Sequence, residues 1–377
     1  MRTLLQAEFE APANRFTPLL RYQLRASFAI GVAFAVCLEV LVILVKGPHP
    51  VIVATSLGVG LALGCVVGWL EVRVLPRLLG SVRFPVAVLL ATALYVALGL
   101  VFLALLQAVS AAYVAEMLAH PRGPLSTLLG NSTGLTAEDL RRLRFDRLGF
   151  VQALAVYSLT CFLTVLLYQL TRKIGPRMLW RFLLGHYHQP VAEDRIFMFL
   201  DVKGATTLAE RLGDEPYSRL LSDFFRDISN PILATRGEVY QYVGDEVVIT
   251  WLAVDGLAQA RCLHCYFEMV AAIQRRAAHY RACYGLVPEF KAGVHGGIVT
   301  ATQVGEIKSE IVYHSDVLNT ASRIQGQCNA LSSWLLVSAD VHERLGAAGR
   351  LRFHDLGRAI LRGKQQAVGL YDVCLAI

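Results

Sequence analysis

Four apolar segments constrain this chain more than any other feature of its sequence. They are Ala26–Val45, Val51–Leu70, Pro85–Ser110 and Gly149–Leu170, and each approaches or exceeds the roughly 20 residues that a helix needs to cross a bilayer. The chain has 377 residues, of which 55% are hydrophobic and only 17% charged, whereas a soluble domain carries about 25% charged residues. This composition excludes a purely soluble or a disordered protein. We therefore predict an α-helical membrane anchor with four transmembrane helices over residues 1–170.

Basic residues predict the orientation of this anchor, because Lys and Arg favour the cytoplasmic ends of spans. They precede the first segment, join the second to the third and follow the fourth: Arg15, Arg21, Arg25; Arg73, Arg77, Arg83; Arg172, Lys173, Arg177, Arg181. All three groups fall on one side if both ends of the anchor face the cytoplasm. We expect a multi-pass protein of the cell inner (plasma) membrane, with a cytoplasmic second half. The net charge of +7 is explained by these flanks, so the lipid bilayer is an expected partner and nucleic acid is not.

The sequence pattern changes after the fourth segment. Residues 171–194 mix basic, aromatic and proline residues, which indicates a juxtamembrane linker. Beyond them, β-rich runs at Arg195–Val202, Gly237–Leu252 and Glu289–Thr300 alternate with helical periodicity. The second run holds a Gly-Asp turn, which is typical of a hairpin. The order βαββαβ predicts an α/β domain of ferredoxin-like topology over residues 195–377, with a mixed sheet covered by helices on one face.

Two carboxylates stand out in this predicted domain. Asp201 ends the first strand, and Asp245 lies in the turn of the hairpin that we expect beside it. Acids that converge at the ends of neighbouring strands suit hard divalent cations, which prefer oxygen ligands. The small residues that follow, Lys203-Gly204-Ala-Thr206, allow backbone N–H groups to approach a phosphate at a helix start. The alternative from these residues alone is that both are ordinary turn acids.

Four motifs in a fixed order extend this interpretation. They are Asp201-Val-Lys-Gly-Ala-Thr206, Val243-Gly-Asp-Glu246, Lys291-Ala-Gly-Val-His-Gly-Gly297 and Asp316-Val-Leu-Asn-Thr-Ala-Ser-Arg323. This series resembles the class III adenylate/guanylate cyclase domain, and the resemblance covers roughly Arg195 to Val373. It implies attack of a ribose 3′-hydroxyl on the α-phosphate of a nucleoside triphosphate, with release of pyrophosphate.

The resemblance also implies roles for individual residues. Asp201, Asp245 and the carbonyl of Val202 match the ligands of two divalent cations, Mg²⁺ or Mn²⁺. Asn319 and Arg323 match the pair that steadies the ribose and the α-phosphate.

A basic residue near the C-terminus is implied at the terminal phosphates. Arg362 matches the family's lysine best, and Lys364 is the alternative. Because the family builds its sites between two catalytic domains, one domain per chain implies a homodimer.

The base-reading positions depart from the family. Gln241 stands where adenylate cyclases commonly have Lys and guanylate cyclases Glu, and Val312 stands where a polar residue is more usual. A glutamine amide can present either a donor or an acceptor to a purine. We expect a membrane-bound adenylate cyclase that makes cyclic AMP from ATP. The alternatives are a guanylate cyclase and a catalytically silent nucleotide-binding partner.

Overall fold

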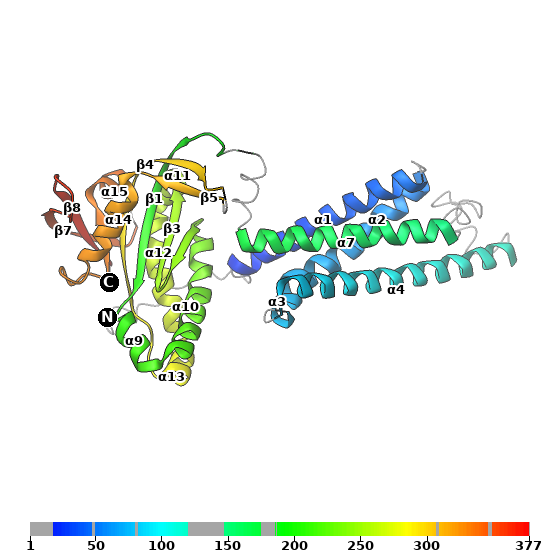
Figure 1. Cartoon of the computed structure of the whole chain (residues 1–377), viewed down its shortest axis with the longest axis horizontal. Helices are drawn as coiled ribbons and strands as arrows, with labels where there is room; N and C mark the ends of the chain where they lie inside the picture. The colour runs from blue at the N-terminus through cyan, green and yellow to red at the C-terminus, as the bar shows by residue number, and fades with distance from the viewer. Residues whose placement is uncertain are drawn as a thin grey trace. The chain divides into compact units, whose positions relative to one another are not determined.

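A computed structural model describes residues 18–46, 50–79, 82–119, 147–174, 185, 187–306, 309–345 and 349–376. The chain divides into two compact units, one formed by Arg21–Trp180 and the other by Arg181–Ile377 together with Met1–Leu20. Figure 1 shows the first unit as helices and the second as a sheet with helices. Each unit is described by itself below.

The first unit is a helical bundle. Its long helices are α1 (Pro18–Lys46), α2 (Pro50–Trp69), α4 (Phe84–Ala119) and α7 (Arg147–Ile174), and α2 runs on through the π-helix Leu70–Val74 into the short helix α3 (Leu75–Leu78). Its core joins side chains from all four long helices, among them Phe34, Val67, Tyr95 and Val165. The helices coincide with the four predicted segments.

Close packing of α1 on α2 depends on small residues. A Cβ at Gly64 would lie 2.3 Å from the carbonyl oxygen of Gly31, and one at Gly68 would lie 2.1 Å from that of Ser27. Such spacing of small residues lets helix backbones approach each other where the solvent provides little hydrophobic driving force.

Two segments of the described residues are long and apolar enough to cross a membrane. They are Phe84–Val101 and Leu154–Thr171, while Ser27–Val40 is a shorter apolar stretch. Association with a membrane thus has support in the first unit, and the four-span anchor remains a prediction.

The second unit is built on one mixed sheet. Its strands are β1 (Val191–Val202), β2 (Glu238–Val243), β3 (Glu246–Leu252), β4 (Phe290–Val304), β5 (Glu310–His314), β6 (Leu335–Ser338), β7 (Leu351–Ala359) and β8 (Val368–Leu375). The order is β2-β3-β1-β4-β6-β8-β7, with β5 paired to β4. Within it, β2-β3-β1-β4 is antiparallel throughout, and β6 joins β4 in parallel. The predicted βαββαβ order is confirmed.

One face of this sheet forms the main core. Alternate residues of β1 (Ile196, Met198 and Leu200) are fully buried there with Phe224 and Met269. These last two belong to α10 (Asp214–Ala234) and α12 (Arg261–Arg275). This unit also holds the helices α9 (Ala205–Leu212), α11 (Ala253–Leu257), α13 (Ala277–Tyr284), α14 (Asp316–Gln327) and α15 (Ala339–Arg344).

The sheet is covered on both faces, so the prediction of helices on one face was wrong. Helix α14 (Asp316–Gln327) packs on β4 and β1, and a Cβ at Gly293 would lie 2.2 Å from the backbone nitrogen of Gln325. Gly293 alternates with the core residues Ala292 and Val294, which places α14 on the opposite face. The sequence reading also missed β5, because its five residues are too few to establish a period.

Candidate active site

Asp201 and Asp245 meet at one end of the sheet. Asp201 is the penultimate residue of β1 and pairs in register with Glu246, the residue that follows Asp245 in the β2–β3 turn. The carboxyl of Asp245 shares a hydrogen bond with that of Asp201. Burial, this hydrogen bond and the charge of Asp201 raise the pKa of Asp245 to about 6. The structure therefore brings the two predicted metal ligands together.

A third acid adds to the negative charge here. Burial and the charges of Asp201 and Asp245 raise the pKa of Glu246 to about 7. The sequence reading included Glu246 in a motif without giving it a role. Among the described residues, no group of three His, Cys, Asp or Glu side chains has the geometry of a metal centre. A cation bound here would need further oxygen ligands from the backbone, the substrate or water.

Two polar side chains of the same chain contact the carboxylate of Asp201. The amide nitrogen of Gln325 donates to Oδ2 of Asp201 over 3.1 Å, and Nζ of Lys291 lies 3.6 Å from the same oxygen. Lys291 is the register partner of Asp201 on β4. Sequence reasoning missed both roles, although strand pairing was a usable signal for Lys291. The contact from Gln325 depends on the close approach of α14 at Gly293.

The predicted phosphate loop lies directly after the acids. Gly204 takes a left-handed conformation (φ 69°) and precedes α9 as its N-cap, and Lys203, Gly204 and Thr206 are exposed. Nζ of Lys203 lies 4.3 Å from the ring centroid of Trp334 and 3.7 Å from a carboxylate oxygen of Glu289. Val202 has its side chain in the core, so only its backbone can serve the site.

Helix α14 and the segment that precedes β8 carry the second group of predicted residues. Asn319 is exposed and Arg323 half-buried on α14, and a Cβ at Gly363 would lie 3.5 Å from Nη2 of Arg323. Nζ of Lys364 lies 2.6 Å from Oδ2 of Asp316 at the start of the same helix. Arg362, by contrast, is exposed. Lys364 is therefore the basic residue that the fold ties to α14.

The predicted base readers lie on two different strands. Gln241 is exposed on the edge strand β2, directly after an irregularity in its pairing with β3. Val312 is half-buried on β5 opposite Thr302.

The predicted site residues form separate groups in one chain. Within the described part of the chain, no hydrogen bond or ion pair joins Asp201 or Asp245 to Asn319 or Arg323. The acids offer hard oxygen donors and carry a mutual repulsion that a divalent cation would relieve, so these residues fit such an ion. The second group offers an amide and two cations that suit phosphate oxygens.

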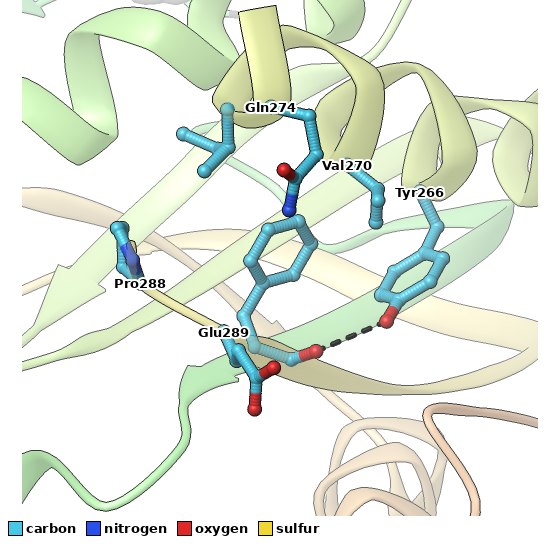
Figure 2. A pocket seen from close by; sticks show the side chains of 7 residues that line it. Tyr266, Val270, Gln274, Pro288 and Glu289 are labelled. Carbon is cyan, nitrogen blue, oxygen red and sulfur yellow. Dashed lines mark hydrogen bonds between the residues drawn. The ribbon is translucent and has the colours of Figure 1, made fainter. Parts of the chain in front are cut away.

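A small pocket lies elsewhere, between α12 and the start of β4 (Figure 2). Its lining includes Tyr266, Val270 and Pro288, and the hydroxyl of Tyr266 donates to the carbonyl of Phe290 over 3.0 Å. The lining holds none of the predicted site residues. We therefore place the candidate active site at the acids and on α14.

Comparisons with known proteins identify the domain in which these residues lie. Residues 188–371 match the family model described as adenylate and guanylate cyclase catalytic domain. The chain is 36% identical over 200 residues to Adenylate cyclase 2 of Rhizobium meliloti (strain 1021), which covers 53% of this chain and 55% of that protein. It is 28% identical over 197 residues to Adenylate cyclase 1 of the same organism, covering 50% of this chain and 29% of that protein. The chain thus matches about half the length of the first relative and less of the second.

A solved structure is similar in fold. A bacterial light-regulated adenylyl cyclase aligns with a TM-score of 0.50 at 20% identity, covering 58% of this chain and 64% of that one. The motifs, the sheet topology and the family match all point to the same half of the molecule. Residues 188–371 of this chain belong to the class III adenylate/guanylate cyclase family.

Proposed function

We propose that this protein is a membrane-bound adenylate cyclase that converts ATP to 3′,5′-cyclic AMP and pyrophosphate in intracellular signalling. The observation that carries the proposal is the facing pair of Asp201 and Asp245 at one end of the sheet. This pair lies inside the stretch that matches the cyclase family and two relatives named adenylate cyclase.

Asp201, Asp245 and the carbonyl of Val202 would hold two divalent cations, Mg²⁺ or Mn²⁺. When bound, such ions favour deprotonation of an attacking hydroxyl and neutralise charge on the phosphates. Gln325 and Lys291 contact Oδ2 of Asp201, so Oδ1 of Asp201 and the carboxylate of Asp245 are the oxygens that we propose as cation ligands. The protein's own contribution here is to place the carboxylate oxygens of Asp201 and Asp245 close together as ligands for the cations.

The remaining groups position the substrate. Asn319 would orient the ribose, and Arg323 would pair with oxygens of the α-phosphate, whose negative charge grows during the displacement. Lys203, Gly204 and Thr206 present exposed groups at the start of α9 for further phosphate oxygens. The contact of Lys364 with Asp316 supports Lys364 over Arg362 as the ligand of the terminal phosphates. Lys364 would exchange that carboxylate for phosphate when substrate binds.

A homodimer would complete each site. Among the described residues, no hydrogen bond or ion pair joins Asp201 or Asp245 to Asn319 or Arg323, which supports two composite sites shared between two copies. The exposed apolar residues Tyr242 and Val243 beside the acids are 50% and 53% exposed, and their burial against a second domain would favour association.

Gln241 and Val312 would contact the base. The names of the relatives support ATP as substrate. A guanylate cyclase is the second candidate, because the amide of Gln241 can also accept from guanine. The helical unit, with its two apolar segments, would anchor the enzyme in the inner membrane through four spans and leave the catalytic domain in the cytoplasm.

The test uses the full chain purified in detergent, with ATP or GTP and with Mg²⁺ or Mn²⁺. We expect cyclic AMP in excess from wild type. Asp201→Ala and Arg323→Ala should each be inactive, and a mixture of the two chains should recover up to about a quarter of wild-type activity through one intact composite site. Asp214→Ala, an exposed acid on α10, is the matched control and should be fully active.

Predominant cyclic GMP would favour the guanylate cyclase. A folded dimer that makes neither product would favour the silent partner. Inactive mixtures would contradict the shared site.

A further inference from the structure

A buried charge cluster lies on the face of the sheet opposite the main core. Arg195 is fully buried on β1, where its Nε donates to Glu193 over 2.6 Å and its Nη1 lies 3.7 Å from Glu238 on β2. Its guanidinium carbon lies 4.8 Å from the ring centroid of Tyr313 on β5. Its Nη1 also donates to Oγ1 of Thr250 on β3 over 3.5 Å, so one cation contacts residues of β1, β2, β3 and β5.

Stability alone is a poor explanation for this cluster. A buried ion pair often stabilises a fold no more than apolar residues of the same volume. Moreover, Nη2 of Arg195 is buried and has no hydrogen-bond partner among the described residues. The contacts of Arg195 instead hold β2 and β5 against β1.

Aromatic contacts extend the cluster between the two strands that carry the base readers. The rings of Tyr240 on β2 and Tyr313 on β5 lie 5.1 Å apart between centroids, and both pack on Phe197 of β1. Tyr240 directly precedes Gln241, and Tyr313 directly follows Val312. A shift of either tyrosine would therefore move a base reader.

The segment that precedes β1 is connected to the same cluster. Tyr187 is 2% exposed, and its hydroxyl donates to Oε1 of Glu193 over 2.8 Å. Its carbonyl accepts from the backbone nitrogen of Gln303 over 3.0 Å. Gln303 pairs with Ile311, the neighbour of Val312. Tyr187 is thus connected to β5 in two ways. Its hydroxyl contacts Glu193, which bonds Arg195 beside Tyr313, and its carbonyl bonds Gln303, which pairs with β5.

We propose that Arg195 is a positioning residue that sets β2 and β5 for recognition of the nucleotide base, and that Tyr187 links the juxtamembrane segment to it. The inference rests on the proposed function in one respect, the roles of Gln241 and Val312. A displacement of the chain before β1 would then change base selection or substrate affinity through Glu193 and Arg195, with no change at the acids.

The test compares Tyr187→Phe with Tyr280→Phe in the full-length protein. Each variant removes a buried tyrosine hydroxyl that donates to a carboxylate over 2.8 Å, but the acceptor of Tyr280 is Asp227 on α10. Hydrogen exchange is followed over residues 238–243 and 310–314, and kcat and KM are measured with ATP and with GTP.

We expect Tyr187→Phe to raise exchange in both segments by about tenfold, the effect of losing one charge-assisted bond. We also expect it to change the ratio of kcat/KM for ATP over GTP by about threefold or more, mainly through KM. Tyr280→Phe should leave the ratio and both segments unchanged.

Equal exchange patterns in the two variants would overturn the proposal, as would faster exchange with an unchanged ratio. A wild-type protein with no cyclase activity would contradict the proposed function. In that case the exchange data would still decide whether Tyr187 holds the two strands.

Discussion

The helical unit holds a buried carboxylate and the cyclase domain a partly buried carboxylate pair, and the two environments are opposite. Glu71 in the π-helix after α2 is 1% exposed. It accepts from the hydroxyl of Tyr95 over 2.6 Å and from the amide of Gln169 over 2.8 Å. Asp245 in the cyclase domain faces another carboxylate, Asp201, and its pKa rises to about 6 because of burial and that neighbour.

This difference separates a structural acid from one that we propose to be functional. Neutral donors from α4 and α7 satisfy Glu71, so it joins three helices. Asp245 and Asp201 repel each other, which costs stability until a cation joins them. Substitution of Asp245 should therefore lower turnover without lowering the stability of the fold, whereas substitution of Glu71 should lower the stability.

The largest effect is expected for Asp245→Asn. Turnover should fall by at least about 100-fold, because the amide is a poor ligand for a divalent cation. The pKa of Asp245 is raised in the folded protein, so its ionised form opposes folding above about pH 6. Asp245→Asn should therefore unfold at the same temperature as wild type or higher when measured by calorimetry at pH 8. A large loss of stability would place Asp245 in the same class as Glu71.

The next effect is expected for Glu71→Ala. It removes two hydrogen bonds, which leaves the amide of Gln169 short of a partner and the hydroxyl of Tyr95 with only the carbonyl of Val67 at 3.5 Å, at a cost of about 2–3 kcal/mol. Glu71→Gln keeps an acceptor oxygen and should cost about 1 kcal/mol. Thermal unfolding of the detergent-solubilised chain measures both. If Glu71→Ala were as stable as wild type, the three-helix connection would have no structural importance.

A buried histidine extends the comparison within the cyclase domain. Nδ1 of His295 lies 2.7 Å from the hydroxyl of Ser338, and burial lowers the pKa of His295 to about 4. The unfolded chain binds a proton between about pH 6.5 and 4 that the folded chain does not, so stability falls as pH drops through this window. We expect the titration of His295 to contribute a loss of about 2 kcal/mol between pH 7 and 5. The raised pKa values of Asp245 and Glu246 act in the opposite direction over this range, so the contribution of His295 is measured as the difference between wild type and His295→Gln in denaturant unfolding at each pH.

The control for this loss is His295→Gln. The variant should lose less stability than wild type over the same range. Identical pH profiles would show that other groups cause the loss.

The smallest effect is expected for Gln325→Glu, which replaces a donor to Asp201 with a carboxylate. Repulsion should lower turnover by about tenfold and raise the Mg²⁺ concentration needed for half-maximal activity. Gln327→Glu adds the same charge two residues further along the chain and should leave both values close to wild type. Equal effects of the two variants would mean that net charge matters and the contact at Asp201 does not.

Much of the site was predictable from local sequence. Asp201 ends an apolar β-rich run and Asp245 lies in a Gly-Asp turn, and the pairing of β1 with β3 brings the two together. Asn319 and Arg323 lie four residues apart on one helix. Local geometry decides the spacing of Asn319 and Arg323, whereas the two acids were predictable because each ends or turns a recognisable strand.

Other features depend on contacts between distant parts of the chain. Gln325 lies 124 positions from Asp201, and only the close approach of α14 to Gly293 brings them together. The arrangement of Tyr187, Arg195 and Tyr313 requires three segments to meet in space. The partners of Glu71 lie 24 and 98 positions away.

By itself, the sequence determined the division into an apolar helical half and an α/β half, the order of the core strands and the family of the second half. Periodicity, turn chemistry and motif spacing are local properties that a chain carries before it folds. Only the tertiary structure decided that α14 covers the second face of the sheet and that Lys364 is the basic residue tied to it. Helix packing and side-chain contacts set these outcomes, and they depend on distances through space, which a one-dimensional pattern does not encode.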